Sequence, residues 1–269
     1  VPFTPVPGPR LLTLEGDIQA KQALFASMQA LIENNNLSSA HINFIDIDDL
    51  TAARDNSWMI REGLQFHWHN QNYESFDQFL EFLTSRKRKN IRKERDSIQE
   101  SGIRFEHLTG DTIKPIHWDI FYQCYLATIE KKWGGAYLTR KFFESLSGNI
   151  ADKILLILAY DGDTPIAGAL NFIGPDALYG RNWGGLRDVP FLHFETCYYQ
   201  AIDFAIKMGL KRVEAGAQGL HKVPRGYLPS KTYSAHKILN PQFEEAIMRF
   251  LRQEALQNQE EALLIAKTS

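Results

Sequence analysis

Three strand-like segments follow one another in the middle of the chain and constrain the fold more than any other feature. They are Ile154–Tyr160, Pro165–Ile173 and Ala177–Trp183. Each has the length of a strand, the first has the continuous apolar composition of a buried strand, and Asp161-Gly-Asp between the first two is a hairpin signal. A helical pattern at 191–208 then leads to a further strand, Lys211–Ala215. Strands interrupted by a helix in this way predict a mixed sheet with helices packed on it.

The rest of the chain continues this mixture of strands and helices. Helical periodicity occurs at 17–33, 48–53, 75–100, 118–129, 142–146 and from 241 onward, and strand patterns occur at 41–45, 59–68, 103–107 and 232–238. The apolar share of 44% suits a packed globular chain. Neither a tandem repeat nor a low-complexity tract interrupts the pattern, so an α/β (α+β) fold is expected throughout.

A segment dense in ionisable side chains follows the strand at 211–215. Its chemically versatile residues are Glu214, Gln218, His221, Lys222, Arg225 and Tyr227. Glycines at 216, 219 and 226 permit tight turns and close approach of the backbone to a ligand. Catalytic groups are often carried by such loops on a rigid scaffold. We therefore expect part of an active site here; the alternative is a polar connection with a few salt bridges.

A run of cations occupies the second half of the helix expected at Ser75–Glu100. Residues 86–95 contain seven Lys or Arg and one Glu, so the local formal charge is 7 − 1 = +6. The run is either a solvated helical surface with i,i+4 ion pairs or a binding surface for a phosphate-rich ligand. Lys87 lies on the apolar stripe, where a lysine needs an anionic partner, and this favours the binding surface.

The strand at 177–183 and the helix after it carry a second group of polar residues. Arg181 and Asn182 point to opposite faces if the strand is regular, and the two following glycines free backbone N–H groups for a ligand. His193 and Glu195 lie in the first turn of the helix. Glu195 suits the helix dipole there, and His193 is either a base or a capping contact.

Several classes of protein are disfavoured by what the sequence lacks. It has no P-loop, no dinucleotide-binding fingerprint, and no G-x-S-x-G or H-E-x-x-H motif. His67 and His69 share one face of a strand without an obvious third ligand, so we expect a pocket there and no metal. Cys124 and Cys197 give no disulfide framework, which suits the cytoplasm. The net charge of −2 gives no global attraction to nucleic acid or membrane.

Five strings of the sequence agree in order with one known family. They are Phe66-His-Trp-His-Asn, Arg86-Lys-Arg-Lys-Asn-Ile-Arg-Lys-Glu-Arg, Gly180-Arg-Asn-Trp-Gly, His193-Phe-Glu-Thr-Cys-Tyr-Tyr-Gln and Glu214-Ala-Gly-Ala-Gln-Gly-Leu-His-Lys. Together they resemble the FemAB-like, peptidoglycan-biosynthesis branch of the GNAT acyltransferase superfamily, over nearly the whole chain from Val1 to Phe243. The usual GNAT pyrophosphate-binding pattern, Q/R-x-x-G-x-G/A, is absent between Trp183 and Phe194, which does not favour acetyl-CoA as the donor.

The resemblance implies two tandem GNAT-like modules, each a mixed sheet flanked by helices. The chain begins at Val1 in Pro-rich sequence without Met, so we expect the first module to be truncated at its N-terminus. The expected boundaries are 1–73 for the remainder of the first module, 74–111 for a basic helical linker, 112–240 for the second module, and 241–269 for a C-terminal helix and polar tail.

The resemblance also implies an acyltransferase. The better-studied relatives move an amino acid from aminoacyl-tRNA to an amine of a peptidoglycan precursor, so aminoacyl-tRNA or acyl-CoA is the expected co-substrate. A tRNA would be held through Arg86–Arg95. A non-catalytic module that binds RNA or a phosphorylated precursor, and an acyl-CoA-dependent N-acetyltransferase of a small amine, are the alternatives.

Acyl transfer to an amine needs a base for the amine proton, donors for the oxyanion and a proton for the leaving group. We expect Glu214 or His221 to be the base, with His193 a further catalytic candidate. Arg181 and nearby backbone N–H groups are expected to stabilise the oxyanion. The expected substrate contacts are Lys87, Asn90, Arg92, His67, His69, Asn182, Trp183, Glu195, Gln218, Lys222, Arg225, and, as proton donors to the leaving group, Tyr233 and His236.

Overall fold

The computed structural model describes residues 4–131, 135–217 and 219–268, and its contacts divide the chain into two compact units. Unit 1 contains the chain up to Phe66 and again from Leu228 onward, and unit 2 contains most of 67–227. The units therefore interleave along the chain, whereas the expected modules were consecutive. The reason is that the last strand returns to pair with the first.

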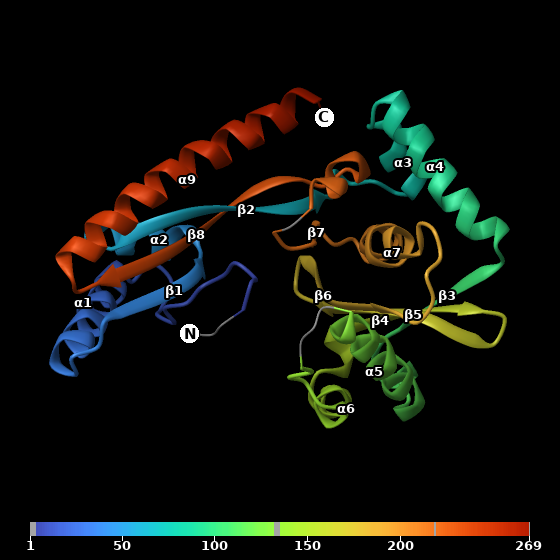
Figure 1. The fold of residues 1–269 in the computed structure, drawn as a ribbon, viewed down its shortest axis with the longest axis horizontal. Coiled ribbons are helices and arrows are strands. Elements are labelled where there is room, and N and C mark those ends of the chain that lie inside the picture. The colour runs from blue at the N-terminus through green and yellow to red at the C-terminus, as the bar shows by residue number, and fades with distance from the viewer. Residues whose placement is uncertain (1–3, 132–134, 218, 269) are drawn as a thin grey trace. The chain divides into compact units, whose positions relative to one another are not determined.

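Unit 1 is built on three strands with the order β1-β8-β2. Its elements are α1 (Ile18–Asn34), β1 (Ser39–Ile45), α2 (Ile47–Asp55), β2 (Met59–His69), β8 (Leu228–Ile238) and α9 (Pro241–Thr268). The antiparallel β1–β8 pair and the two first helices enclose a core that includes Phe25, Leu50 and Trp58. Helix α9 follows β8 in the chain (Figure 1), and its Leu251 packs against Met59 and Ile238.

Unit 2 continues from the end of β2 in the strand order β2-β7-β6-β5-β4-β3. Its strands are β3 (Ile103–Leu108), β4 (Ile154–Asp161), β5 (Thr164–Ile173), β6 (Ala177–Gly185) and β7 (Arg212–Glu214). Strands β3 to β6 form an antiparallel meander, whereas β6 and β7 are parallel. The sheet is thus mixed, as the sequence predicts.

Helices cover both faces of the unit 2 sheet. Helices α5 (Pro115–Glu130) and α6 (Arg140–Asn149) lie on one face, and α7 (Leu192–Phe194) with α8 (Gln200–Lys207) lies on the other (Figure 1). The first pair encloses the larger core, in which Trp118, Phe121 and Phe143 pack on β4 and β5. Helices α3 (Phe76–Glu81) and α4 (Ser85–Glu100) contact the side of α7–α8 away from the sheet.

Two helices differ from the sequence prediction. The helix expected at 75–100 is broken, because Thr84 takes an extended conformation and becomes the N-cap of α4. Ser75 caps α3 as expected. The helix expected at 191–208 contains a π-helical segment, η3 (Glu195–Tyr199), in which the Gln200 N–H bonds to the Glu195 carbonyl five residues back. Such π-turns are rare and often occur at functional sites.

Candidate functional site

The parallel strands β6 and β7 separate after three paired residues. Their register runs from Ala177 opposite Arg212 to Tyr179 opposite Glu214, and β6 then continues alone on that side to Gly185. A cavity of about 150 Å³ opens where they part. It is lined by Ala169, Leu170, Asn171, Gly180, Arg181, Asn182, Trp183, His193, Cys197, Tyr198 and Ala215. Crevices beyond the carboxyl ends of parallel strands are common ligand sites.

The strand that forms one wall of this cavity is irregular. Asn171 pairs with Gly180 and Leu170 pairs with Asn182, so Arg181 is the extra residue of a β-bulge. The bulge is why Arg181 and Asn182 do not alternate as in a regular strand. Arg181 is exposed, and its Nη2 lies 3.4 Å from the Tyr137 hydroxyl.

Gly184 has a packing role that the sequence did not indicate. A Cβ at this position would lie 1.8 Å from the Cys124 carbonyl oxygen on α5. Only glycine allows helix α5 to approach β6 this closely. We predicted that this glycine would free the backbone for a ligand. In the structure Gly184 instead allows close contact between α5 and β6, and this contact fixes the position of β6 beside the cavity.

The opposite wall comes from the irregular helix. The rings of His193 and Trp183 lie 5.1 Å apart, and those of His193 and Tyr198 lie 5.4 Å apart. Trp183 and His193 also line a second cavity of about 370 Å³ that contains Lys131 and Arg187. The same two aromatic rings therefore border both cavities.

Tyr198 and His221 form a hydrogen-bonded pair at the site. The Tyr198 hydroxyl lies 2.9 Å from His221 Nε2. His221 can lie there because residue 219 is glycine: a Cβ would be 2.2 Å from its Cε1, and φ of Gly219 is +108°. Burial, followed by the nearby Lys222 and Arg225 charges, lowers the pKa of His221. Burial raises the pKa of Tyr198. At neutral pH the pair is thus a neutral imidazole beside a protonated phenol.

The two cations after His221 point into the protein. Lys222 is 4% exposed, its Nζ donates to the Ala215 carbonyl at 2.6 Å, and burial lowers its pKa to about 8. Arg225 is also buried; it donates to Glu94 on α4 at 2.6 Å, and its guanidinium lies 3.4 Å from the centroid of the Phe194 ring. Both cations hold the segment Leu220–Arg225 in place. Arg225, for which we predicted a substrate contact, is buried and bonded to Glu94.

Glu214 lies on the other face of the sheet from the Tyr198–His221 pair. It is paired with Tyr179, which is paired with Phe172, and Phe172 packs on the α5–α6 core. Residues paired across strands share a face. There Glu214 accepts from Arg212 at 2.8 Å, and its Oε2 lies 3.8 Å from His67 Nε2. Of the two candidate bases, His221 therefore contacts Tyr198, which lines the cavity, whereas Glu214 lies on the other face of the sheet.

His67 and His69 lie beside this buried carboxylate. They are opposite Glu214 and Arg212 in the β2–β7 ladder, and their rings lie 6.2 Å apart. Burial lowers the pKa of His67 to about 4 and also lowers that of His69. Across residues 4–131, 135–217 and 219–268, no cluster of three metal-ligating side chains occurs.

The remaining candidates are dispersed. Tyr233 and His236 belong to β8 of unit 1, where His236 Nδ1 lies 2.8 Å from His41 Nδ1. Gln218 lies outside the described residues. On α4, Lys87 is half-buried and Asn90 is exposed. Arg92 and Glu195 line a separate cavity considered below.

Sequence reasoning missed three residues of the site. Tyr198 and Cys197 fall within the helix predicted at 191–208 and were not singled out there; both belong to the π-helical segment and line the cavity. Asn171 is 2% exposed and lines the cavity, with its Nδ2 donating to the Leu155 carbonyl. A polar residue inside an apolar strand was the available signal for Asn171.

The mixed sheet with its flanking helices is an α/β fold that the solved structure of FemX shares. Residues 1–268 match the FemAB-like family of peptidoglycan biosynthesis and recognition, and the chain belongs to that family. No curated protein matches it at a significant level. Among the helices of the described residues, none has the length and apolar character needed to cross a membrane.

Two solved structures illustrate the shared fold. FemX superposes with a TM-score of 0.61 at 13% identity, over 92% of this chain and 85% of FemX. L-PGS from Bacillus licheniformis superposes with a TM-score of 0.60 at 9% identity, over 86% of this chain and 78% of L-PGS. At such identities the likeness shows the fold alone.

Proposed function

We propose that this chain transfers an acyl or aminoacyl group from an activated ester or thioester to an amine of a peptidoglycan precursor, in the cavity between β6 and β7. The observation that carries the proposal is the neutral Tyr198–His221 pair, whose tyrosine lines the cavity where the two parallel strands separate. The cavity of about 150 Å³ accommodates a reacting acyl group and not a whole substrate. Membership of the FemAB-like family supports the acceptor class.

The pair supplies a path for the amine proton. Tyr198 lines the cavity and its hydroxyl donates to His221 Nε2. As the amine nitrogen attacks the carbonyl carbon, its proton passes to the Tyr198 oxygen while the Tyr198 proton passes to His221. When the carbon–oxygen or carbon–sulfur bond breaks, the proton returns by the same path to the leaving group. Each atom of the pair ends where it began, as a catalyst requires.

The oxyanion would be stabilised by the backbone of β6. Beyond Tyr179, groups on the β7 side of β6 have no ladder partner among the described residues. Backbone N–H groups near Arg181 and Asn182 can therefore donate to a developing oxyanion. The second cavity, beyond Trp183 and His193, would hold the rest of one substrate beside the reacting carbonyl.

Helix α4 suits a polyanionic donor such as tRNA. The residues Arg86, Lys89 and Lys93 are all exposed on it. Lys87, which we expected to be buried against an anionic partner, is half-buried and has no ion-pair partner among the described residues. These cations favour aminoacyl-tRNA over acyl-CoA, consistent with the missing pyrophosphate-binding pattern.

Competition between donors tests this proposal. We expect a short aminoacyl-RNA mimic with a stable amide link to bind more weakly as salt rises, and to bind more weakly still when Lys89 and Lys93 are both changed to Gln. Trp183→Ala should weaken binding of the mimic without changing how that binding depends on salt. Binding of acetyl-CoA in place of the mimic would favour the acyl-CoA alternative. Tight RNA binding that does not require the aminoacyl group would favour the non-catalytic module.

A further inference from the structure

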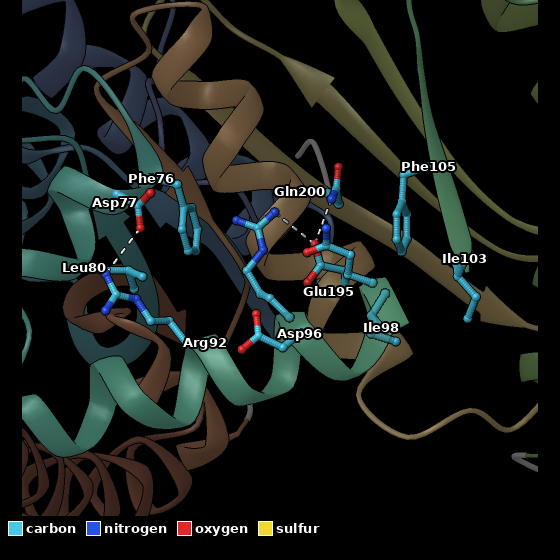
Figure 2. Close-up of a pocket in the computed structure, with 12 residues that line it drawn as sticks. Phe76, Asp77, Leu80, Arg92, Asp96, Ile98, Ile103, Phe105, Glu195 and Gln200 are labelled. Carbon is cyan, nitrogen blue, oxygen red and sulfur yellow. Dashed lines mark hydrogen bonds and ion pairs between the residues drawn. The ribbon is translucent and has the colours of Figure 1, made fainter. Parts of the chain in front are cut away.

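A separate cavity of about 450 Å³ lies on the other side of the irregular helix, between it and α4. Figure 2 shows Glu195 at its centre, with Phe76 and Phe105 on either side. Its lining residues are Phe76, Asp77, Leu80, Arg92, Arg95, Asp96, Ile98, Gln99, Ile103, Phe105, Glu195 and Gln200. None of these lines the cavity between β6 and β7, so the proposed acyl transfer does not use this space.

Negative charge dominates this cavity once its internal ion pairs are formed. Arg95 is engaged by Asp203 at 2.7 Å and by Glu195 at 3.2 Å. Arg92 faces Asp77 at 3.5 Å. Asp96 is exposed and has no ion-pair partner among the described residues. Each guanidinium therefore already faces a carboxylate, and the carboxylates that line the cavity outnumber its guanidinium groups.

Glu195 is the strongest evidence for a ligand. It is 3% exposed, and its Oε1 accepts from Gln200 Nε2 at 2.7 Å and lies near Arg95. Its Oε2 is buried without a hydrogen-bond partner in the described part of the chain. A buried carboxylate oxygen without a donor is costly. A cation that entered the cavity, with a small rotation of the carboxylate, would supply the missing donor.

The π-turn explains how Glu195 is placed there. In an α-helix, residues five apart point in different directions, but in η3 the backbone bond from Gln200 to Glu195 stacks them. Their side chains can then bond to each other, and Gln200 holds one carboxylate oxygen while leaving the second free. Burial also raises the pKa of Glu195, as expected for a carboxylate without a full set of donors.

We propose that this cavity binds a small organic cation that carries a primary ammonium or guanidinium group on an alkyl chain. The charged group pairs with Glu195 and Asp96, and the alkyl chain lies against the rings of Phe76 and Phe105. The same aromatic surface already stacks a guanidinium, since Arg95 lies 4.2 Å from the Phe76 ring centroid. The site is a second ligand site, on the opposite side of the helix from Tyr198.

Calorimetric titration of the full chain with cadaverine and agmatine tests the proposal, with inorganic phosphate as the anionic probe. We expect both amines to bind, and Glu195→Gln to weaken binding by about tenfold or more, as for loss of a charge-assisted contact. Gln keeps the size of Glu and a carbonyl acceptor, and a near-ultraviolet circular dichroism spectrum checks that it folds. Asp96→Asn lies on the surface and provides a second variant, for which we expect a several-fold loss.

Two controls separate this site from others. Asp152→Asn removes a carboxylate that is 73% exposed in its side chain and does not line the cavity, and should leave binding unchanged. Tyr198→Phe should also leave it unchanged, because Tyr198 lines the other cavity. The proposal is overturned if neither amine binds at about 10 mM, since a Kd above that concentration corresponds to a binding free energy of less than about 3 kcal/mol. It is also overturned if Glu195→Gln and Asp96→Asn bind the amines as the wild type does. Phosphate binding that is lost in Arg92→Gln would likewise overturn it.

Discussion

Glu94→Gln should be among the most destabilising single changes in unit 2. Glu94 accepts from Arg225 at 2.6 Å and from the Tyr199 hydroxyl, so it joins α4 to both the π-helical segment and the segment Leu220–Arg225. The side chains of Glu94 and Arg225 are 14% and 8% exposed. Removing the carboxylate charge leaves a buried guanidinium without its counter-ion.

The expected loss follows from that burial. Breaking one partner of a buried ion pair typically costs about 3–5 kcal/mol, because the remaining charge is uncompensated. For a unit of this size, each kcal/mol lowers the Tm by about 2–4 °C, so the fall should be about 6–20 °C. The double variant Glu94→Gln/Arg225→Met removes both charges and should lose less than the single variant, since nothing buried is left unpaired.

Urea unfolding followed by circular dichroism measures these differences. The matched control is Asp77→Asn. It removes the partner of Arg92, which lies on the same helix, α4, as Glu94. That pair is 3.5 Å long with side chains 54% and 81% exposed, and such surface pairs contribute about 0–1 kcal/mol. If Glu94→Gln costs no more than Asp77→Asn, the claim that Arg225 is held as a buried structural cation is wrong.

Three further results are expected. Gly184→Ala should destabilise the fold by at least about 1–3 kcal/mol in chemical unfolding, because its Cβ would overlap the Cys124 carbonyl; an unchanged midpoint would refute this close packing. Stability should fall by up to about 3 kcal/mol as pH drops from 6.5 to 4, because burial holds the folded-state pKa of His67 at about 4. Between these pH values the imidazole is protonated in the unfolded chain but not in the folded one, and His67→Gln should remove that share of the pH dependence. Gly219→Ala should reduce transfer while sparing the melting temperature of unit 1, because the added Cβ would displace His221.

Much of the sheet could be predicted from the sequence because its strands are short apolar runs separated by turn signals. The strands at 154–160, 165–173 and 177–183 occur as β4, β5 and β6 with small shifts at their ends. The separation of β6 from β7 could not be read in the same way. It depends on a bulge at Arg181 and on the glycine contact at 184, both of which are tertiary features.

The candidate site shows the same limit. His221 was proposed as a catalytic residue because it lies in a glycine-rich segment, but nothing in the sequence singled out its hydrogen-bond partner Tyr198 within the helix predicted at 191–208. A helical repeat assumes that residues three or four apart share a face, and the π-turn at Glu195–Tyr199 breaks that assumption. The face of the sheet on which Glu214 lies was also beyond prediction, because a position next to the loop says nothing about which face the side chain occupies.

Single-turnover formation of the amide tests the central claim most directly. The full chain would be mixed with labelled aminoacyl-tRNA or acyl-CoA and an amine-bearing peptidoglycan precursor, and the product measured by mass spectrometry. We expect amide formation by the wild type, a fall of about 10²–10⁴ in His221→Gln, and no change in Asp152→Asn. Wild-type rates in His221→Gln, or no amide from either class of donor, would contradict the account.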